Sequence, residues 1–65
     1  MRIKTNVFHS EGGVLVSAWV YLPELHDVLE VRRQSGFSEF QQGLDLARCT
    51  RDVLEQLHNH PLGVQ

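Results

Sequence analysis

The chain has little cysteine, no excess of positive charge and no long hydrophobic run, and each shortage excludes a class of protein. Cys49 is the only cysteine among 65 residues, so no disulfide can form within one chain, and a lone thiol is typical of a reducing compartment. The formal net charge is −2, whereas generic binding to nucleic acid or membrane surfaces needs an excess of Lys and Arg. No hydrophobic run reaches a membrane-spanning length, and the basic start at Met1 to Lys4 lacks a hydrophobic signal core. We expect a soluble, cytoplasmic protein that has no membrane partner.

Signatures of catalysis, metal binding and cofactor binding are also missing. His58 and His60 could bring two imidazoles near one ion, but zinc needs about three or four protein ligands, and neither a cysteine pair nor a helical His-x-x-x-His spacing is present. Cys49 would need a lowered pKa and an oriented base to act as a nucleophile, and the sequence indicates neither. We therefore expect no enzyme activity, no bound metal and no cofactor.

The longest apolar run, Val14–Leu22, is rich in β-branched and aromatic residues and is predicted to form a central strand. Residues 2–9 alternate apolar and polar side chains, as a half-buried strand does, and the turn residues from Ser10 to Gly13 separate the two segments. An antiparallel β-hairpin is expected. Its predicted register pairs Val7 with Val16 and Ile3 with Val20 on one face, and Phe8 with Leu15, Lys4 with Trp19 and Arg2 with Tyr21 on the other.

The second face of this hairpin carries the residues expected to bind a partner. An apolar surface of Phe8, Leu15, Trp19 and Tyr21 predicts contact with a protein. The alternative is a nucleic-acid surface, in which Trp19 and Tyr21 stack on unpaired bases while Arg2 and Lys4 attract phosphates. Plain packing under a helix or a second subunit would also account for the aromatic rings.

The segment from Pro23 to Gln34 admits two interpretations. Acidic residues early, Arg32 and Arg33 late and Gly36 beyond them favour a short helix over residues 24–34. Alternatively, Val28–Arg32 forms a third strand that adds to the hairpin. We favour the helix.

Residues 38–58 have the clearest helical pattern, with a capping box at Ser38-Glu39-Phe40-Gln41. Their apolar stripe covers about half of the helix circumference, more than the roughly 100° that one neighbour needs. Gly43 lies within the stripe and allows close approach of another backbone. Cys49 falls on the opposite, polar side with Asp45, Arg48, Asp52 and Gln56, and residues 61–65 are expected to be a frayed tail. Core or dimer packing is assigned to Gly43, Leu46, Val53 and Leu57.

Two family resemblances accompany these patterns. The order from Val14 to His58, a strand and two helices separated by Leu22-Pro23 and Gly36-Phe37-Ser38, resembles the ribbon-helix-helix DNA-binding family. That resemblance implies that Ser17, Trp19 and Tyr21 would face the major groove. The hairpin, the Leu22-Pro23-Glu24-Leu25 corner, a strand at Val28–Arg32 and the helix start at Gly36-Phe37-Ser38-Glu39 are similar to the N-terminal domain of HicB-type antitoxins. Both resemblances imply a small dimeric regulator without catalytic activity.

The sequence thus predicts one α+β domain over residues 1–65, with an N-terminal antiparallel hairpin, a short helix or third strand, and a long C-terminal helix. A core this small supplies only about 3–5 kcal/mol, so self-association, most simply a homodimer, is expected. The favoured function is non-enzymatic regulation or inhibition of a protein partner, as small proteins of phages and other mobile elements carry out. The alternative is a transcriptional regulator or antitoxin that binds nucleic acid.

Overall fold

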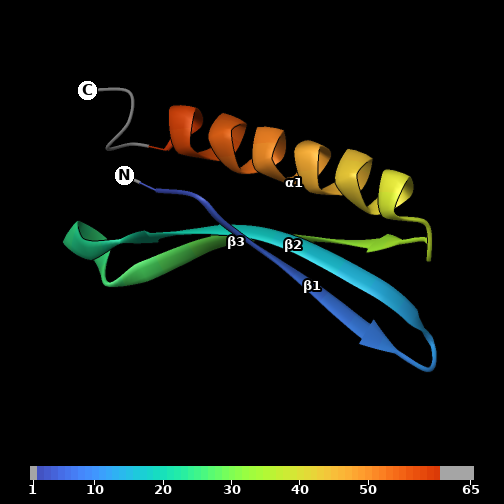
Figure 1. The fold of residues 1–65 in the computed structure, drawn as a ribbon. Coiled ribbons are helices and arrows are strands. Elements are labelled where there is room, and N and C mark those ends of the chain that lie inside the picture. The colour runs from blue at the N-terminus through green and yellow to red at the C-terminus, as the bar shows by residue number, and fades with distance from the viewer. Residues whose placement is uncertain (1, 61–65) are drawn as a thin grey trace.

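The computed structural model describes residues 2–60, which form a three-stranded sheet with one long helix on one face (Figure 1). The strands pair antiparallel in the order β1-β2-β3, so β2 is central. The α+β class and the central strand are therefore confirmed. The elements are β1 (Lys4–Ser10), β2 (Gly13–Leu22), the 3-10 turn η1 (Pro23–Leu25), β3 (Asp27–Ser35) and α1 (Glu39–Asn59).

The hairpin of β1 and β2 has the predicted register. Val7 lies opposite Val16, and Ser10 lies opposite Gly13 across a two-residue loop. Gly13 has a φ of 138°, a conformation that side-chain-bearing residues rarely adopt. The Ser10 hydroxyl donates a hydrogen bond to the Gly13 carbonyl at 3.2 Å. On the other face of the hairpin, Phe8 lies opposite Leu15 and Lys4 lies opposite Trp19, as predicted.

Residues 27–35 form a strand, so the favoured helix over residues 24–34 is wrong and the alternative of a third strand is correct. Pro23 starts a single 3-10 turn, and His26 ends it in the left-handed conformation, with φ 50° and ψ 44°. This corner reverses the chain, and β3 then pairs with β2 along its whole length. The pairing supplies partners for backbone groups on the second edge of β2, which outweighs the helix-like charge gradient of the segment.

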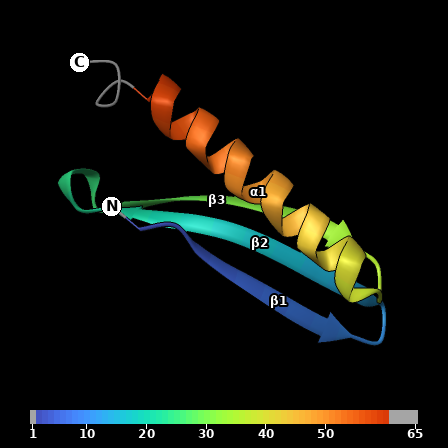
Figure 2. The same ribbon diagram turned by 45° about the horizontal axis from the view of Figure 1, so that its top comes forward.

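The hydrophobic core lies between α1 and the sheet, mainly over β2 and β3, while β1 extends to one side (Figure 2). Every second residue of β2 points into it, as the two-residue repeat of a strand requires. None of the buried side chains in the described part of the chain is aromatic. The fully buried apolar residues are Val14, Val16, Ala18, Val20, Leu22, Cys49 and Val53.

Helix α1 begins where the capping box predicts. The Ser38 hydroxyl accepts a hydrogen bond from the backbone N–H of Gln41 at 3.3 Å, and the Ser38 carbonyl accepts one from the N–H of Gln42 at 3.0 Å. The structure therefore places the helix at Glu39–Asn59, within one residue of the predicted 38–58. The predicted tail at residues 61–65 lies outside the described residues.

The orientation of α1 differs from the wheel-based prediction. The prediction that Cys49 and Asp45 lie on a solvated side is wrong, because they are 0% and 3% exposed and face the sheet. The side-chain amide of Gln42, also buried, donates to the Gly36 carbonyl at 3.1 Å and ties the first turn to the end of β3. The small β2 side chains leave space for this polar side of the helix, and Arg33 of β3 pairs with Asp52 at 3.7 Å.

Candidate interaction surface

The sheet face opposite α1 has no covering layer in the described part of the chain. The alternate residues of β2 that α1 does not cover point to this face, together with neighbours on both outer strands. Phe8, Tyr21 and Val28 are 55%, 48% and 46% exposed, which leaves apolar surface in water at both ends of this face. Patches of this kind commonly mark binding sites. We call the surface formed by Phe8, Leu15, Trp19, Tyr21 and Val28 the open face.

Trp19 lies at the centre of the open face and is held by its neighbours on β1. The Lys4 ammonium nitrogen lies 5.3 Å from the centroid of the Trp19 ring, within the range of a cation–π contact. With the Asn6 amide oriented to satisfy both of its groups, its oxygen accepts a hydrogen bond from the indole N–H at 2.9 Å. The indole is therefore fixed on the sheet surface and is only partly exposed.

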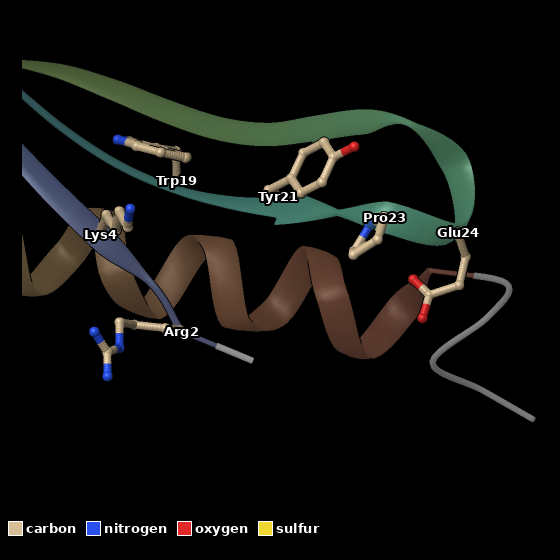
Figure 3. Close-up of a pocket in the computed structure, with 6 residues that line it drawn as sticks. All are labelled: Arg2, Lys4, Trp19, Tyr21, Pro23 and Glu24. Atoms are coloured by element: carbon tan, nitrogen blue, oxygen red, sulfur yellow. The ribbon is translucent and has the colours of Figure 1, made fainter.

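Beside Trp19, the open face is hollowed at the end where β2 meets η1 (Figure 3). The hollow has a volume of about 580 Å³. It brings together all four residues of the nucleic-acid alternative, and Glu24 adds a negative charge to its rim. The lining residues are Arg2, Lys4, Trp19, Tyr21, Pro23 and Glu24.

Charges on the open face are mixed and partly paired. The Arg32 Nε lies 3.0 Å from Glu30 Oε1 on β3, and the Lys4 ammonium is placed over the Trp19 ring. A groove for nucleic acid needs cations that track a phosphate backbone. With Glu24 and Glu30 among them, the cations of this face do not form an uninterrupted basic track.

Ser17 lies between Leu15 and Trp19 on the same side of β2, and its cross-strand partners are Asn6 and Arg32. It is 0% exposed although no layer covers this face, because the larger side chains around it close over it. Its hydroxyl has no hydrogen-bond partner among the described residues. The middle of the open face is therefore closely packed, and its exposed apolar surface lies at the two ends.

The four helix residues assigned to core or dimer packing lie in different environments. Val53 is fully buried, and Leu46 and Leu57 pack against the core from its margin. Gly43 faces outward, with no atom within 4 Å of the position that a Cβ would occupy. The close approach predicted at Gly43 therefore involves no other part of the described chain.

Val28 was missing from the predicted surface, whereas Phe40, Leu44 and Leu54 are the exposed part of the wide apolar stripe predicted for the helix. Val28 belongs to the open face opposite Tyr21, and the strand interpretation of residues 28–32 would have revealed it. Phe40, Leu44 and Leu54 form a second stripe on the outer side of α1, where they are 77%, 40% and 50% exposed. The sequence shows their spacing of four and ten residues. It does not show which half of the wide stripe faces the sheet.

The buried polar groups of α1 have altered acid–base properties. Burial raises the pKa of the Cys49 thiol, with nearby Arg33 opposing the effect, so the thiol is protonated at neutral pH and is a poor nucleophile. A hydrogen bond from Gln41 to Asp45 at 3.0 Å lowers the pKa of that carboxyl. Ser35, Arg48 and Arg33 act in the same direction, and burial opposes them. Both groups are sequestered between helix and sheet and cannot reach a substrate on the open face.

Residues 2–60 hold no group of three or more His, Cys, Asp and Glu side chains that could bind a metal ion. His58 lies in the last turn of α1 and His60 is its C-cap residue, so both belong to the helix side of the sheet and not to the open face. None of the helices described is both long enough and apolar enough to cross a membrane. Comparison with known protein families, with curated proteins and with solved structures finds no match to this chain.

Proposed function

We propose that the chain is a non-enzymatic binding protein that docks a protein partner on the open face and thereby regulates or inhibits it. The observation that carries the proposal is the position of the aromatic residues. Aromatic side chains usually dominate the core energetics of a small domain, yet here Phe8, Tyr21, Phe37 and Phe40 are all about half exposed or more. Two of the four lie on the open face, where a partner would bury them.

Composition of the open face supports a protein rather than a nucleic acid as partner. Protein interfaces are centred on a few aromatic and aliphatic anchors with a polar rim. Trp19, Tyr21 and Leu15 would be those anchors, and Arg2, Lys4 and Glu30 would belong to the rim. The Trp19 ring already carries the Lys4 cation at 5.3 Å, so its π-face is not free for a base.

The element order supports a regulatory role. A hairpin, a Leu-Pro-Glu-Leu corner, a third strand and a helix occur in the order that the resemblance to HicB-type antitoxins implies. The ribbon-helix-helix arrangement needs a helix where this chain has β3. An antitoxin-like inhibitor is therefore the more specific form of the proposal, and the chain would act as a homodimer.

The test is capture of binding proteins from the native host, followed by affinity measurements with the purified partner. Tyr21→Ala and Trp19→Ala should each weaken binding by tenfold or more, as expected of central interface residues. Leu54→Ala is the matched control, since Leu54 is about as exposed as Tyr21 but lies on the outer side of α1. Unchanged affinity in both aromatic variants would contradict the proposal.

The nucleic-acid alternative is examined with the same proteins. Binding to DNA and single-stranded RNA is measured at two salt concentrations, because phosphate contacts make affinity fall as salt rises. Salt-sensitive binding that is lost in Arg2→Ala and Trp19→Ala would show that the partner is a nucleic acid bound in the hollow and not a protein.

A further inference from the structure

Strand β3 forms an edge of the sheet, and no other strand among residues 2–60 pairs with that edge. It is nine residues long, and its pairing with β2 runs without a bulge from Ser35 to Asp27. Most of its side chains are exposed, and no proline interrupts it. Such an edge presents a row of unpaired backbone N–H and C=O groups to another strand.

One pair of opposite charges lies symmetrically about the middle of β3. Asp27–Ser35 has Val31 as its central residue, with Glu30 on one side and Arg32 on the other. If a second copy of β3 pairs antiparallel about Val31, all nine residues of the strand find an opposite residue. Glu30 of each copy then lies opposite Arg32 of the other, and cross-strand pairs of opposite charge are stabilising.

The remaining pairs in this register are compatible. Val28 would face Gln34, Leu29 would face Arg33, and Asp27 would face Ser35, so no like charges lie opposite each other. A shift by two residues, which keeps the same faces together, would place Glu30 opposite Glu30 or Arg32 opposite Arg32, and like charges disfavour such pairing. The opposite edge has no such pattern, since pairing of β1 about Val7 places Lys4 opposite Ser10.

The position of α1 leaves room for this arrangement. The helix lies over β2 and β3 (Figure 2), and neighbouring strands are about 4.8 Å apart. Two helices related by a two-fold axis beside β3 would thus run about 10 Å apart, close to the 8–10 Å between packed helices. Arg48 on α1 is exposed, and its charge is already paired with Asp45 at 3.4 Å.

We propose that a second copy of this chain pairs with β3 about Val31. The two sheets join into one continuous antiparallel sheet, with both helices on one side and the two open faces side by side on the other. The inference rests on the self-association proposed above and assigns it a surface. It does not depend on which protein docks on the open face, because β3 pairs through its edge.

The test reverses one charge on β3 in each of two variants and then mixes the variants. Glu30→Arg alone places two cations opposite each other in the dimer, and Arg32→Glu alone places two anions opposite each other. Each variant should weaken dimerisation about tenfold or more, measured by analytical ultracentrifugation over a range of concentrations. Mixing the two variants should restore a dimer that contains one copy of each, because every cross-strand pair is then complementary.

The mixture distinguishes an effect on the dimer interface from an effect on the folding of each copy. Each single variant also loses the Glu30–Arg32 contact within its own strand, and mixing cannot restore that contact. The double variant Glu30→Arg/Arg32→Glu recovers both kinds of pair and should dimerise like the wild type. Circular dichroism confirms that each variant is folded.

Three results would overturn the assignment: a wild-type chain that stays monomeric at high micromolar concentration, a dimer that both single variants leave unchanged, or a mixture that does not associate. Trp19→Ala should leave the dimer intact while weakening partner binding. Loss of partner binding alone therefore concerns the open face, and loss of the dimer alone concerns β3.

Discussion

Leu15 and Val16 are neighbours on β2, yet they lie in two different environments. Val16 is 0% exposed beneath α1, whereas Leu15 is 37% exposed on the open face. The covered face consists of small aliphatic side chains, and the open face carries the larger aromatic ones. The core of the described chain is thus built without buried aromatic side chains, as the proposed contacts between molecules require.

The difference between the covered face and the open face is tested most directly by placing a charge on each face in turn. Val16→Asp should abolish the fold, because an unpaired buried carboxylate costs more than the roughly 3–5 kcal/mol available to so small a core. Leu15→Asp should leave the chain folded, with a loss of about 1 kcal/mol, and remove partner binding. Far-ultraviolet circular dichroism and urea unfolding distinguish the two results. Equal loss of structure in both variants would show that the open face is part of the core.

The same contrast is present on α1 between two adjacent residues. Val53→Ala should lower the free energy of unfolding by about 2 kcal/mol, through lost burial and the cavity that remains. Leu54→Ala should change it by about 0.5 kcal/mol or less, because Leu54 is 50% exposed. Urea titrations of both variants measure the difference. A larger effect at Leu54 would mean that the outer side of the helix is buried, as it would be in an assembly through that stripe.

The buried carboxylate of Asp45 tests the covered side of the molecule through the pH dependence of folding stability. Its pKa is lowered in the folded state, chiefly by the hydrogen bond from Gln41. It therefore stabilises the fold above the ordinary carboxyl pKa of about 4, and that contribution is lost as the pH falls through the lowered value. Thermal unfolding between neutral and strongly acidic pH should show the loss. Asp45→Asn should reduce the dependence in that range, and an unchanged profile would contradict the role of Asp45.

The smallest expected effect comes from removing the hydrogen bond that holds Trp19 on the open face. Asn6→Ala removes the acceptor of the indole N–H and should cost about 0.5–1 kcal/mol. The emission of Trp19, the only tryptophan in the chain, should shift as its hydrogen bond passes to water. Thr5→Ala, at a neighbouring exposed position on the other side of β1, should leave the emission unchanged.

The hairpin could be predicted from the sequence because two independent signals agree. Alternation from Arg2 to His9 and the glycines at positions 12 and 13 allow one register, and a slip by one residue would expose Val16 and bury Leu15. The start of α1 was equally clear, since Ser38 caps the helix through a contact only three residues long. Both features depend on short-range interactions that a sequence displays directly.

The third strand and the orientation of α1 depend on contacts between distant residues. Residues 24–34 have helix-like charges, but pairing with β2 decides their conformation. Cys49 and Asp45 look polar on a helical wheel, yet contacts with Val16 and the neighbouring Arg33 make their side the buried one. The candidate site was partly predictable for the same reason. Its residues on the hairpin were identified, whereas Val28 on β3 was not.

The order of the strands along the chain also has a consequence for folding kinetics. Each strand pairs with its neighbour in sequence, through the turn after Ser10 and the corner at Pro23. Short connections cost little loop-closure entropy, and chains rich in such contacts fold fast. The packing of α1 joins residues that lie farther apart in the chain, as in the contact of Cys49 with the Val16 carbonyl. We therefore expect the sheet to form early and the docking of α1 to complete folding, so the interval between these steps is when the aliphatic side of β2 is most prone to aggregation.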